Sequence, residues 1–343
     1  MKKHVGYAAA VATLLAMMTP AHAQTSGTLS SDGFFKDKTV KIMVGHAPGG
    51  GFDAYARLAA DMLKKHLPGV ATIIVENKPG GGGLIASAHF YAQAARDGTM
   101  MAVFPEQLAN NQVLQPKLAQ WKIEEMRYVG SFAPVNSGLL LRRGAAVKSV
   151  ADMQSVESSV GCDGVNSQGY QYPSMLKNLG GFKFKMVCGY RGSPEYLLAL
   201  EKGEVDIASN AWNALRISHR DKIKTGEVIL FAQGGLRRDP EIADTPLLQD
   251  LVSDAEAKEA IAFASSGAAI GRALLLPPGV AAERVAYLRS IFDAMVKDPD
   301  MIALANQRSL TLAPTPGAEV DKIVANILKA PKELAEKAAT AMK

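Results

Sequence analysis

Pro48-Gly49-Gly50-Gly51-Phe52-Asp53 and Pro79-Gly80-Gly81-Gly82-Gly83 are the two stretches from which the fold of this chain can be predicted. Each lies between a strand-like and a helix-like run, and their spacing of about thirty residues is that of one βαβ unit. In a parallel sheet such turns lie side by side and present free N–H groups at the positive ends of helix dipoles. The pair therefore predicts a cradle for a small anion.

The residues around these turns alternate between strand and helix patterns. β-branched and apolar runs predict the strands, and apolar spacing of three and four residues predicts the helices. The strands are expected at residues 39–46, 71–76 and 99–104, and the helices at 54–66 and 84–95. This order favours a parallel sheet with right-handed crossovers.

Strands at residues 128–132 and 138–142 are expected to flank a crossing between domains. A second α/β set follows, with strands expected at 158–162, 182–188 and 205–209, and the strand at 228–232 is the expected return crossing. Later strands are expected at 273–276, with a short one at 310–313. We expect helices at 170–179, 193–202, 246–265 and over most of 280–339, while 25–36 should be poorly ordered. The predicted fold is α/β with two domains: 34–135 and 232–343 form domain 1, and 136–231 forms domain 2. Two interdomain crossings would then place a cleft at the strand ends.

The first residues have the pattern of a secretory signal peptide. Lys2 and Lys3 precede an apolar run, Val5 to Met18, that is too short to span a bilayer. Ala21-His22-Ala23 is a small-x-small cleavage site, so cleavage is expected after Ala23. The predicted mature protein, without residues 1–23, is soluble and exported.

Composition and motifs exclude several function classes. A net charge of +5, spread evenly, is too small to indicate nucleic-acid binding but suits mild attraction of an anion. The chain has no G-x-S-x-G, HExxH, G-x-G-x-x-G or Gly-Lys-Ser/Thr motif. We therefore expect no catalytic residue, no metal site and no cofactor.

Two cysteines, Cys162 and Cys188, end strand-like runs. An oxidising compartment permits a disulfide, and neighbouring strands bring Cα atoms within reach of one. Two small buried thiols are the alternative.

Several longer stretches resemble one known family. They are VGHAPGGGFDAYARLAADMLKKHLPG, IIVENKPGGGG, RDGT, GYRGSPEYLLALEKGEVD and GRALLLPPGVAAERVAYLRSIFDAMVKDPD, between about Lys38 and Ala338. The family is that of the substrate-binding proteins of tripartite tricarboxylate transporters, the Bug receptors. The resemblance implies a periplasmic, Venus-flytrap-like binding protein without enzymatic activity. It also implies delivery of a di- or tricarboxylate, amino acid or aromatic acid to membrane permease subunits. A sensing protein that presents such a ligand to a signalling receptor is the alternative, and we expect a monomer.

The resemblance also implies a set of ligand-binding residues. They are Pro48, Gly49, Gly50, Gly51, Phe52, Asp53, Gly80, Gly81, Gly82, Gly83, Ser167, Gln168, Gly169, Tyr170, Tyr190, Arg191, Gly192, Ser193, Asn210 and Trp212, with His46 beside the first loop. Three features depart from the family pattern: His46 itself, Gly81 with Gly83, and the polar segment Pro105 to Asn111.

Four side chains each have two interpretations. Asp53 either contacts ligand through water or is an N-cap or first-turn acid of the helix that follows. His46 either donates to a carboxylate or is a satisfied polar residue under the loop. Arg191 either binds the second acid group of a diacid or is a surface residue. Trp212 either covers the ligand or covers the core.

Overall fold

The computed structural model describes residues 33–165 and 167–343. The predicted signal peptide, its cleavage site and residues 25–32 lie outside the described residues. Residues 33–36 are ordered, contrary to expectation, because Phe35 is only 1% exposed within the core and the backbone of Lys36 forms an isolated antiparallel β-bridge with Val70. No helix among the described residues is both long and apolar enough to cross a bilayer.

The first sheet has six strands in the order β11-β4-β10-β3-β1-β2. Their bounds are β1 Thr39–Val44, β2 Thr72–Asn77, β3 Met100–Val103, β4 Arg127–Ser131, β10 Ala273–Leu276 and β11 Thr315–Pro316. As predicted, β1 runs parallel to both β2 and β3. The sheet is mixed, however, because β10 is antiparallel to β3 and β4. The strand predicted at 310–313 is wrong, since the two-residue strand β11 comes later.

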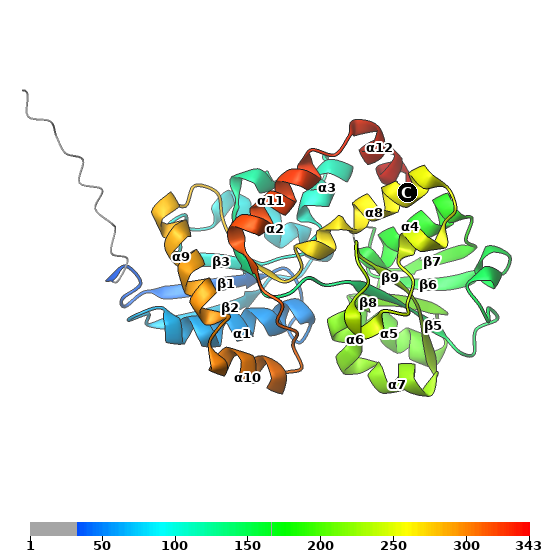
Figure 1. Ribbon diagram of the computed structural model, residues 1–343, viewed down its shortest axis with the longest axis horizontal. Helices are drawn as coiled ribbons and strands as arrows, with labels where there is room; N and C mark the ends of the chain where they lie inside the picture. The colour runs from blue at the N-terminus through cyan, green and yellow to red at the C-terminus, as the bar shows by residue number, and fades with distance from the viewer. Residues whose placement is uncertain (1–32, 166) are drawn as a thin grey trace, which may run out of the picture. The chain divides into compact units, whose positions relative to one another are not determined.

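Helices cover both faces of this sheet (Figure 1). One apolar cluster includes residues of α1 Gly51–His66, α9 Ala282–Met295 and α10 Pro299–Gln307. Another includes residues of α2 Leu84–Gln93, α3 Leu108–Leu114 and α11 Gly317–Leu328. In α1 the residues Tyr55, Leu58, Ala59, Met62 and Leu63 are all buried, which is the helical spacing predicted from the sequence.

The second sheet has five strands in the order β7-β6-β8-β5-β9. Their bounds are β5 Ser137–Arg142, β6 Ser158–Cys162, β7 Phe184–Cys188, β8 Ile207–Ala211 and β9 Val228–Gly234. Strand β6 is parallel to β7 and β8, whereas β5 is antiparallel to β8 and β9. The architecture is therefore α/β with two mixed sheets.

Helices also lie on both faces of the second sheet. Residues of α4 Gln168–Gly180, α8 Ala255–Ser265 and α12 Lys332–Ala341 share one cluster with it. Residues of α5 Ser193–Lys202 and α6 Trp212–Ser218 share another, and α7 Arg220–Thr225 packs against β9. Helices α3, α6 and α7 were not predicted. The helix expected over 246–265 is a short 3-10 turn, Leu248–Leu251, followed by α8.

The chain passes from the first sheet to the second after β4 and returns between α8 and β10. A third passage follows α11, because α12 packs against α8 and α4 rather than against the first sheet. Helices α8 and α12 thus contribute to the second core, although the sequence placed residues 232–343 with domain 1.

Candidate functional site

The two glycine loops lie against each other at the carboxyl ends of β1 and β2. Val44 is in register with Asn77, the last residue of each strand. A Cβ placed on Gly45 would come within 2.9 Å of Gly83 Cα, and one on Gly83 within 3.3 Å of His46 Cε1. Only glycine permits backbone contact this close. The juxtaposition predicted from the sequence is therefore present.

Each loop leads into a helix. Gly50 is the N-cap of α1, and the first intrahelical hydrogen bond runs from Ala54 N–H to the Gly50 carbonyl at 2.9 Å. The N–H groups of residues 51–53 precede that bond, so the helix itself does not use them. The second loop has positive φ at Gly80 through Gly83, a run that side chains rarely adopt, before α2 begins at Leu84.

Asp53 braces the first loop from inside. It is 3% exposed and lies in the first turn of α1, so it is not the N-cap. Its carboxylate accepts hydrogen bonds from Gly49 N–H at 2.9 Å, Arg57 Nε at 2.9 Å and Asn77 Nδ2 at 3.0 Å. Burial acts to raise the pKa of this carboxyl, but these hydrogen bonds hold it below the ordinary value. Asp53 is thus an ionised brace that joins the loop to the end of β2.

His46 lies beside the same loop as a neutral ring. Its centroid is 4.3 Å from that of Phe52, and the two rings are stacked. Its Nδ1 is buried without a partner among the described residues. Burial, and secondarily the charge of Arg272, lower the pKa of His46 to about 4.

A buried ion pair that we did not predict lies next to the loop. Arg272, just before β10, donates from Nη1 to Glu106 Oε2 at 2.6 Å, and each residue is 2% exposed. The guanidinium carbon lies 3.9 Å from the centroid of Phe52. Glu106 falls in the polar segment singled out from the sequence. The sequence signal for this pair is that Arg272 directly precedes the apolar strand β10. Because arginine is almost never fully buried unless it is paired, this position indicates a buried acidic partner.

Glu106 connects the ion pair to the second sheet. Gln168, the first residue of α4, donates from Nε2 to Glu106 Oε1 at 3.2 Å. Gln168 in turn accepts a hydrogen bond from the Ser137 hydroxyl of β5. Gln168, one of the predicted site residues, is therefore connected to the first glycine loop through Glu106 and Arg272.

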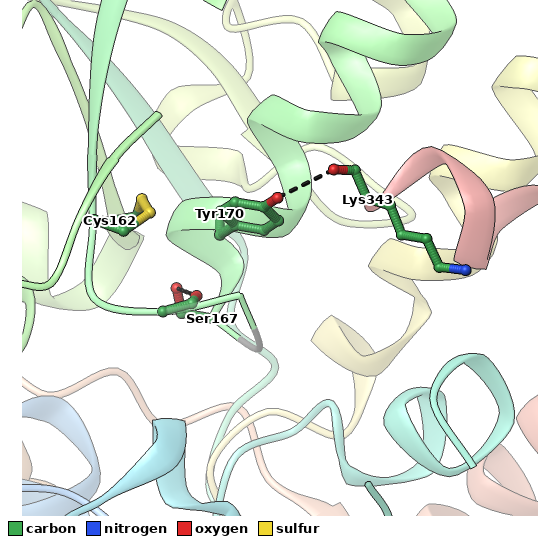
Figure 2. Close-up of a disulfide and its surroundings, with 6 residues drawn as sticks. Cys162, Ser167, Tyr170 and Lys343 are labelled. Atoms are coloured by element: carbon green, nitrogen blue, oxygen red, sulfur yellow. Dashed lines mark hydrogen bonds between the residues drawn. A yellow bond between two sulfur atoms is a disulfide. The ribbon is translucent and has the colours of Figure 1, made fainter. Parts of the chain in front are cut away.

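Other predicted residues of α4 have different surroundings. Ser167 is the N-cap of α4, and Gly169 lies near it, with the buried Ser209 hydroxyl 3.6 Å from the position of a Gly169 Cβ. The Tyr170 hydroxyl donates to the Lys343 carbonyl at 3.2 Å (Figure 2). Tyr170 therefore contacts the C-terminal residue of the chain.

The remaining predicted residues are distributed between surface and core. Arg191, in the turn from Tyr190 to Ser193, has a side chain 92% exposed and pairs with Glu195 at 2.7 Å. Trp212 packs in the core around α5, and its indole N–H donates to Glu241 at 3.1 Å. As ligand contacts, these positions and Asn210 stay predictions. Asn213, which follows Trp212 and was not singled out from the sequence, lies beside Gly51.

A disulfide joins the two strand ends that lead into the second-sheet loops. Cys162 and Cys188 are partners in the parallel β6–β7 register, and their Cα atoms are 4.4 Å apart. Figure 2 shows Cys162 near Ser167, the N-cap of α4, and near Tyr170 in the first turn of that helix. Among the described residues, no group of three or more His, Cys, Asp or Glu side chains could hold a metal ion.

A family model matches most of this chain. The model described as the tripartite tricarboxylate transporter family receptor matches residues 55–337. The chain belongs to this family. The family is one of binding receptors rather than enzymes, in agreement with the sequence prediction.

Individual relatives are more distant. A UPF0065 protein of Agrobacterium vitis is 27% identical over 222 residues, which cover 63% of this chain and 62% of the relative. The periplasmic binding protein BugD has a TM-score of 0.68 at 19% identity, covering 90% of this chain and 98% of BugD. MatC of Rhodopseudomonas palustris, solved with bound malate, has a TM-score of 0.66 at 22% identity, covering 88% of this chain and 99% of MatC. These two structures share the fold of the chain.

Proposed function

We propose that this protein is a periplasmic receptor that captures a small carboxylate and delivers it to the permease subunits of a tripartite tricarboxylate-type transporter. The observation that carries the proposal is the contact between the two glycine loops at the ends of β1 and β2. Membership of the family supports the receptor class, and the malate bound to a structural neighbour supports the ligand class.

The loops have the physical properties of an anion site. The N–H groups that begin α1 are not used within the helix, and the helix dipole places partial positive charge there. The Asp53 carboxylate is paired with the Arg57 guanidinium and also accepts from Gly49 N–H and Asn77, so its negative charge is compensated by its own partners. The loop is thus held in one shape before ligand arrives, which reduces the ordering cost of binding.

A thermal-shift screen of the purified mature protein tests the binding part. The panel holds malate, succinate, citrate, glutamate and benzoate, with malamide as the uncharged relative of malate. A ligand at a hundredfold excess over Kd stabilises the folded state by about 2.7 kcal/mol, which gives a clear shift. If no carboxylate raises the melting temperature, the proposed ligand class is wrong.

A glycine variant tests the place of binding. Gly50 has φ −85°, and a Cβ there would meet only the Ala47 carbonyl oxygen at 3.9 Å, so Gly50→Val should fold. We expect it to lose at least about tenfold in affinity because a branched side chain then stands at the loop surface. Gly82→Val is a poorer probe, since Gly82 has φ +64° and valine would strain the backbone. Unchanged affinity in Gly50→Val would place the site elsewhere.

Delivery and export have separate tests. N-terminal sequencing of periplasmic protein should begin at Gln24, and a chain that retains Met1 would contradict the export proposal. Deletion of the gene should abolish carboxylate uptake that a neighbouring multi-spanning permease supports. Normal uptake with a lost transcriptional response would favour the sensing role instead.

A further inference from the structure

The space beside Gly51 is lined by side-chain nitrogen atoms. A Cβ placed on Gly51 would lie 3.7 Å from Arg272 Nε, 3.8 Å from Arg272 Nη2 and 3.8 Å from Asn213 Nδ2. Arg272 precedes β10 of the first sheet, and Asn213 belongs to α6, which follows β8 of the second. These atoms are at ordinary van der Waals distance from that point, so three side-chain nitrogens converge on the face of Gly51.

The Arg272 guanidinium is hydrogen-bonded to Glu106 on one side, and its other side faces Gly51. Nη1 donates to Glu106, whereas Nε is buried without a partner among the described residues. Nε and Nη2, the two nitrogens nearest Gly51, form the edge that presents two parallel N–H groups to a carboxylate. A buried N–H without an acceptor is costly, and a ligand oxygen would remove that cost.

The neighbours of Arg272 hold the guanidinium in this orientation. Glu106 takes the Nη1 side and is itself hydrogen-bonded by Gln168 at 3.2 Å. The Phe52 ring lies 3.9 Å from Arg272 Cζ, so the cation is also in contact with an aromatic face. Because Glu106 pairs with Arg272, the buried site is close to neutral before ligand enters.

From this geometry we infer a carboxylate subsite at Gly51, an inference that rests on the proposed function. One carboxylate of the ligand binds the Nε–Nη2 edge of Arg272 and the side-chain amide of Asn213, beside the free N–H groups of α1. Glu106 is a positioning residue that keeps the other edge of Arg272 occupied. Because these groups are all N–H donors, the subsite favours a carboxylate, whose oxygens only accept, over the neutral carboxamide, whose NH₂ group would face a donor.

Two variants test the subsite by isothermal titration calorimetry with the panel of malate, succinate, citrate, glutamate and benzoate. Arg272→Lys keeps the positive charge beside Glu106 but removes the pair of parallel N–H donors, because lysine ends in a single ammonium group. Gly51→Ala places a methyl group in the space, at distances of 3.7 to 3.8 Å that the fold tolerates. We expect each to weaken the best panel ligand by about tenfold or more, and wild type to prefer malate over malamide by a similar factor.

Matched controls carry the same chemical changes at exposed positions. Arg238→Lys alters an arginine whose side chain is 48% exposed and pairs with Asp250. Gly33→Ala adds a methyl group where nothing lies within 4 Å. Both controls should bind like wild type.

The outcomes separate the two proposals. The wild-type protein binds a panel carboxylate if the receptor function is right. If Gly51→Ala and Arg272→Lys then bind that carboxylate with wild-type affinity, the subsite is wrong and the receptor function remains supported. Equal affinity for malate and malamide would also overturn it. A wild-type protein that binds no carboxylate would overturn both. If Arg272→Lys does not fold, Gly51→Ala with its control decides the question.

Discussion

Two arginines of this chain lie in opposite environments. Arg191 stands in a glycine-flanked turn, 92% exposed, and forms an i,i+4 pair with Glu195. Arg272 stands before an apolar strand, 2% exposed, between Glu106, Phe52 and Gly51. The sequence singled out the first because turns carry ligands and arginine binds acids. An arginine next to an apolar strand predicts a buried partner, because burial of an unpaired charge is so costly, whereas an arginine in a turn can remain in water.

The largest expected effect comes from breaking the buried pair. Arg272→Met leaves the Glu106 carboxylate buried without its cation, and the free energy of unfolding should fall by about 3 to 5 kcal/mol. The double variant Glu106→Gln/Arg272→Met removes both charges and should recover much of that loss. Urea denaturation of the two variants measures the difference. A single variant as stable as wild type would mean that the pair is open to water in solution.

The next effect is the pH dependence that His46 introduces. Its folded pKa of about 4 lies below the ordinary 6.5, so the unfolded chain binds more protons between these values. The contribution of His46 to the free energy of unfolding is fully present above pH 6.5. As the pH falls toward 4, the free energy of unfolding decreases by up to about 3 kcal/mol from this group. Thermal or urea unfolding across this range checks it.

His46→Gln provides the control, because His219 also has a pKa lowered chiefly by burial and contributes a slope of the same sign. The variant should retain the His219 contribution and lose that of His46. If wild type and His46→Gln have parallel stability profiles between pH 4 and 6.5, the pKa of His46 is the same in the folded and the unfolded chain, and the expected lowering is wrong.

A smaller effect is expected from the brace of the first loop. Asp53→Asn removes the charge that accepts from Gly49, Arg57 and Asn77, at a cost of about 1 to 2 kcal/mol in stability. Affinity for the best carboxylate should fall less than in Gly51→Ala, because Asp53 shapes the loop without touching the ligand. Asp61→Asn, an exposed change on the same helix, should alter neither quantity. A larger loss of affinity in Asp53→Asn than in Gly51→Ala would indicate a ligand contact.

The parts of the molecule that could be predicted share a local cause. Glycine turns, β-branched strands and apolar spacing identified β1, α1, β2 and α2, since each element is determined by its own residues. The juxtaposition of the two loops followed from parallel pairing. The antiparallel insertion of β10 and the packing of α12 on the second core depend on contacts between segments far apart in the chain. For the same reason, the meeting of Arg272, Glu106 and Asn213 could not be predicted from spacing.

The smallest expected effect belongs to Arg191, the exposed one of the two arginines. Arg191→Ala should leave the melting temperature unchanged, because an exposed i,i+4 pair contributes little. Its guanidinium is already hydrated and paired with Glu195, so affinity for malate should fall much less than in Arg272→Lys. Calorimetry with malate and benzoate on both variants measures the contrast. If Arg191→Ala weakens malate more than benzoate, and by as much as Arg272→Lys does, then the turn from Tyr190 to Ser193 reaches the second acid group when ligand is bound. The two arginines would then bind opposite ends of one diacid.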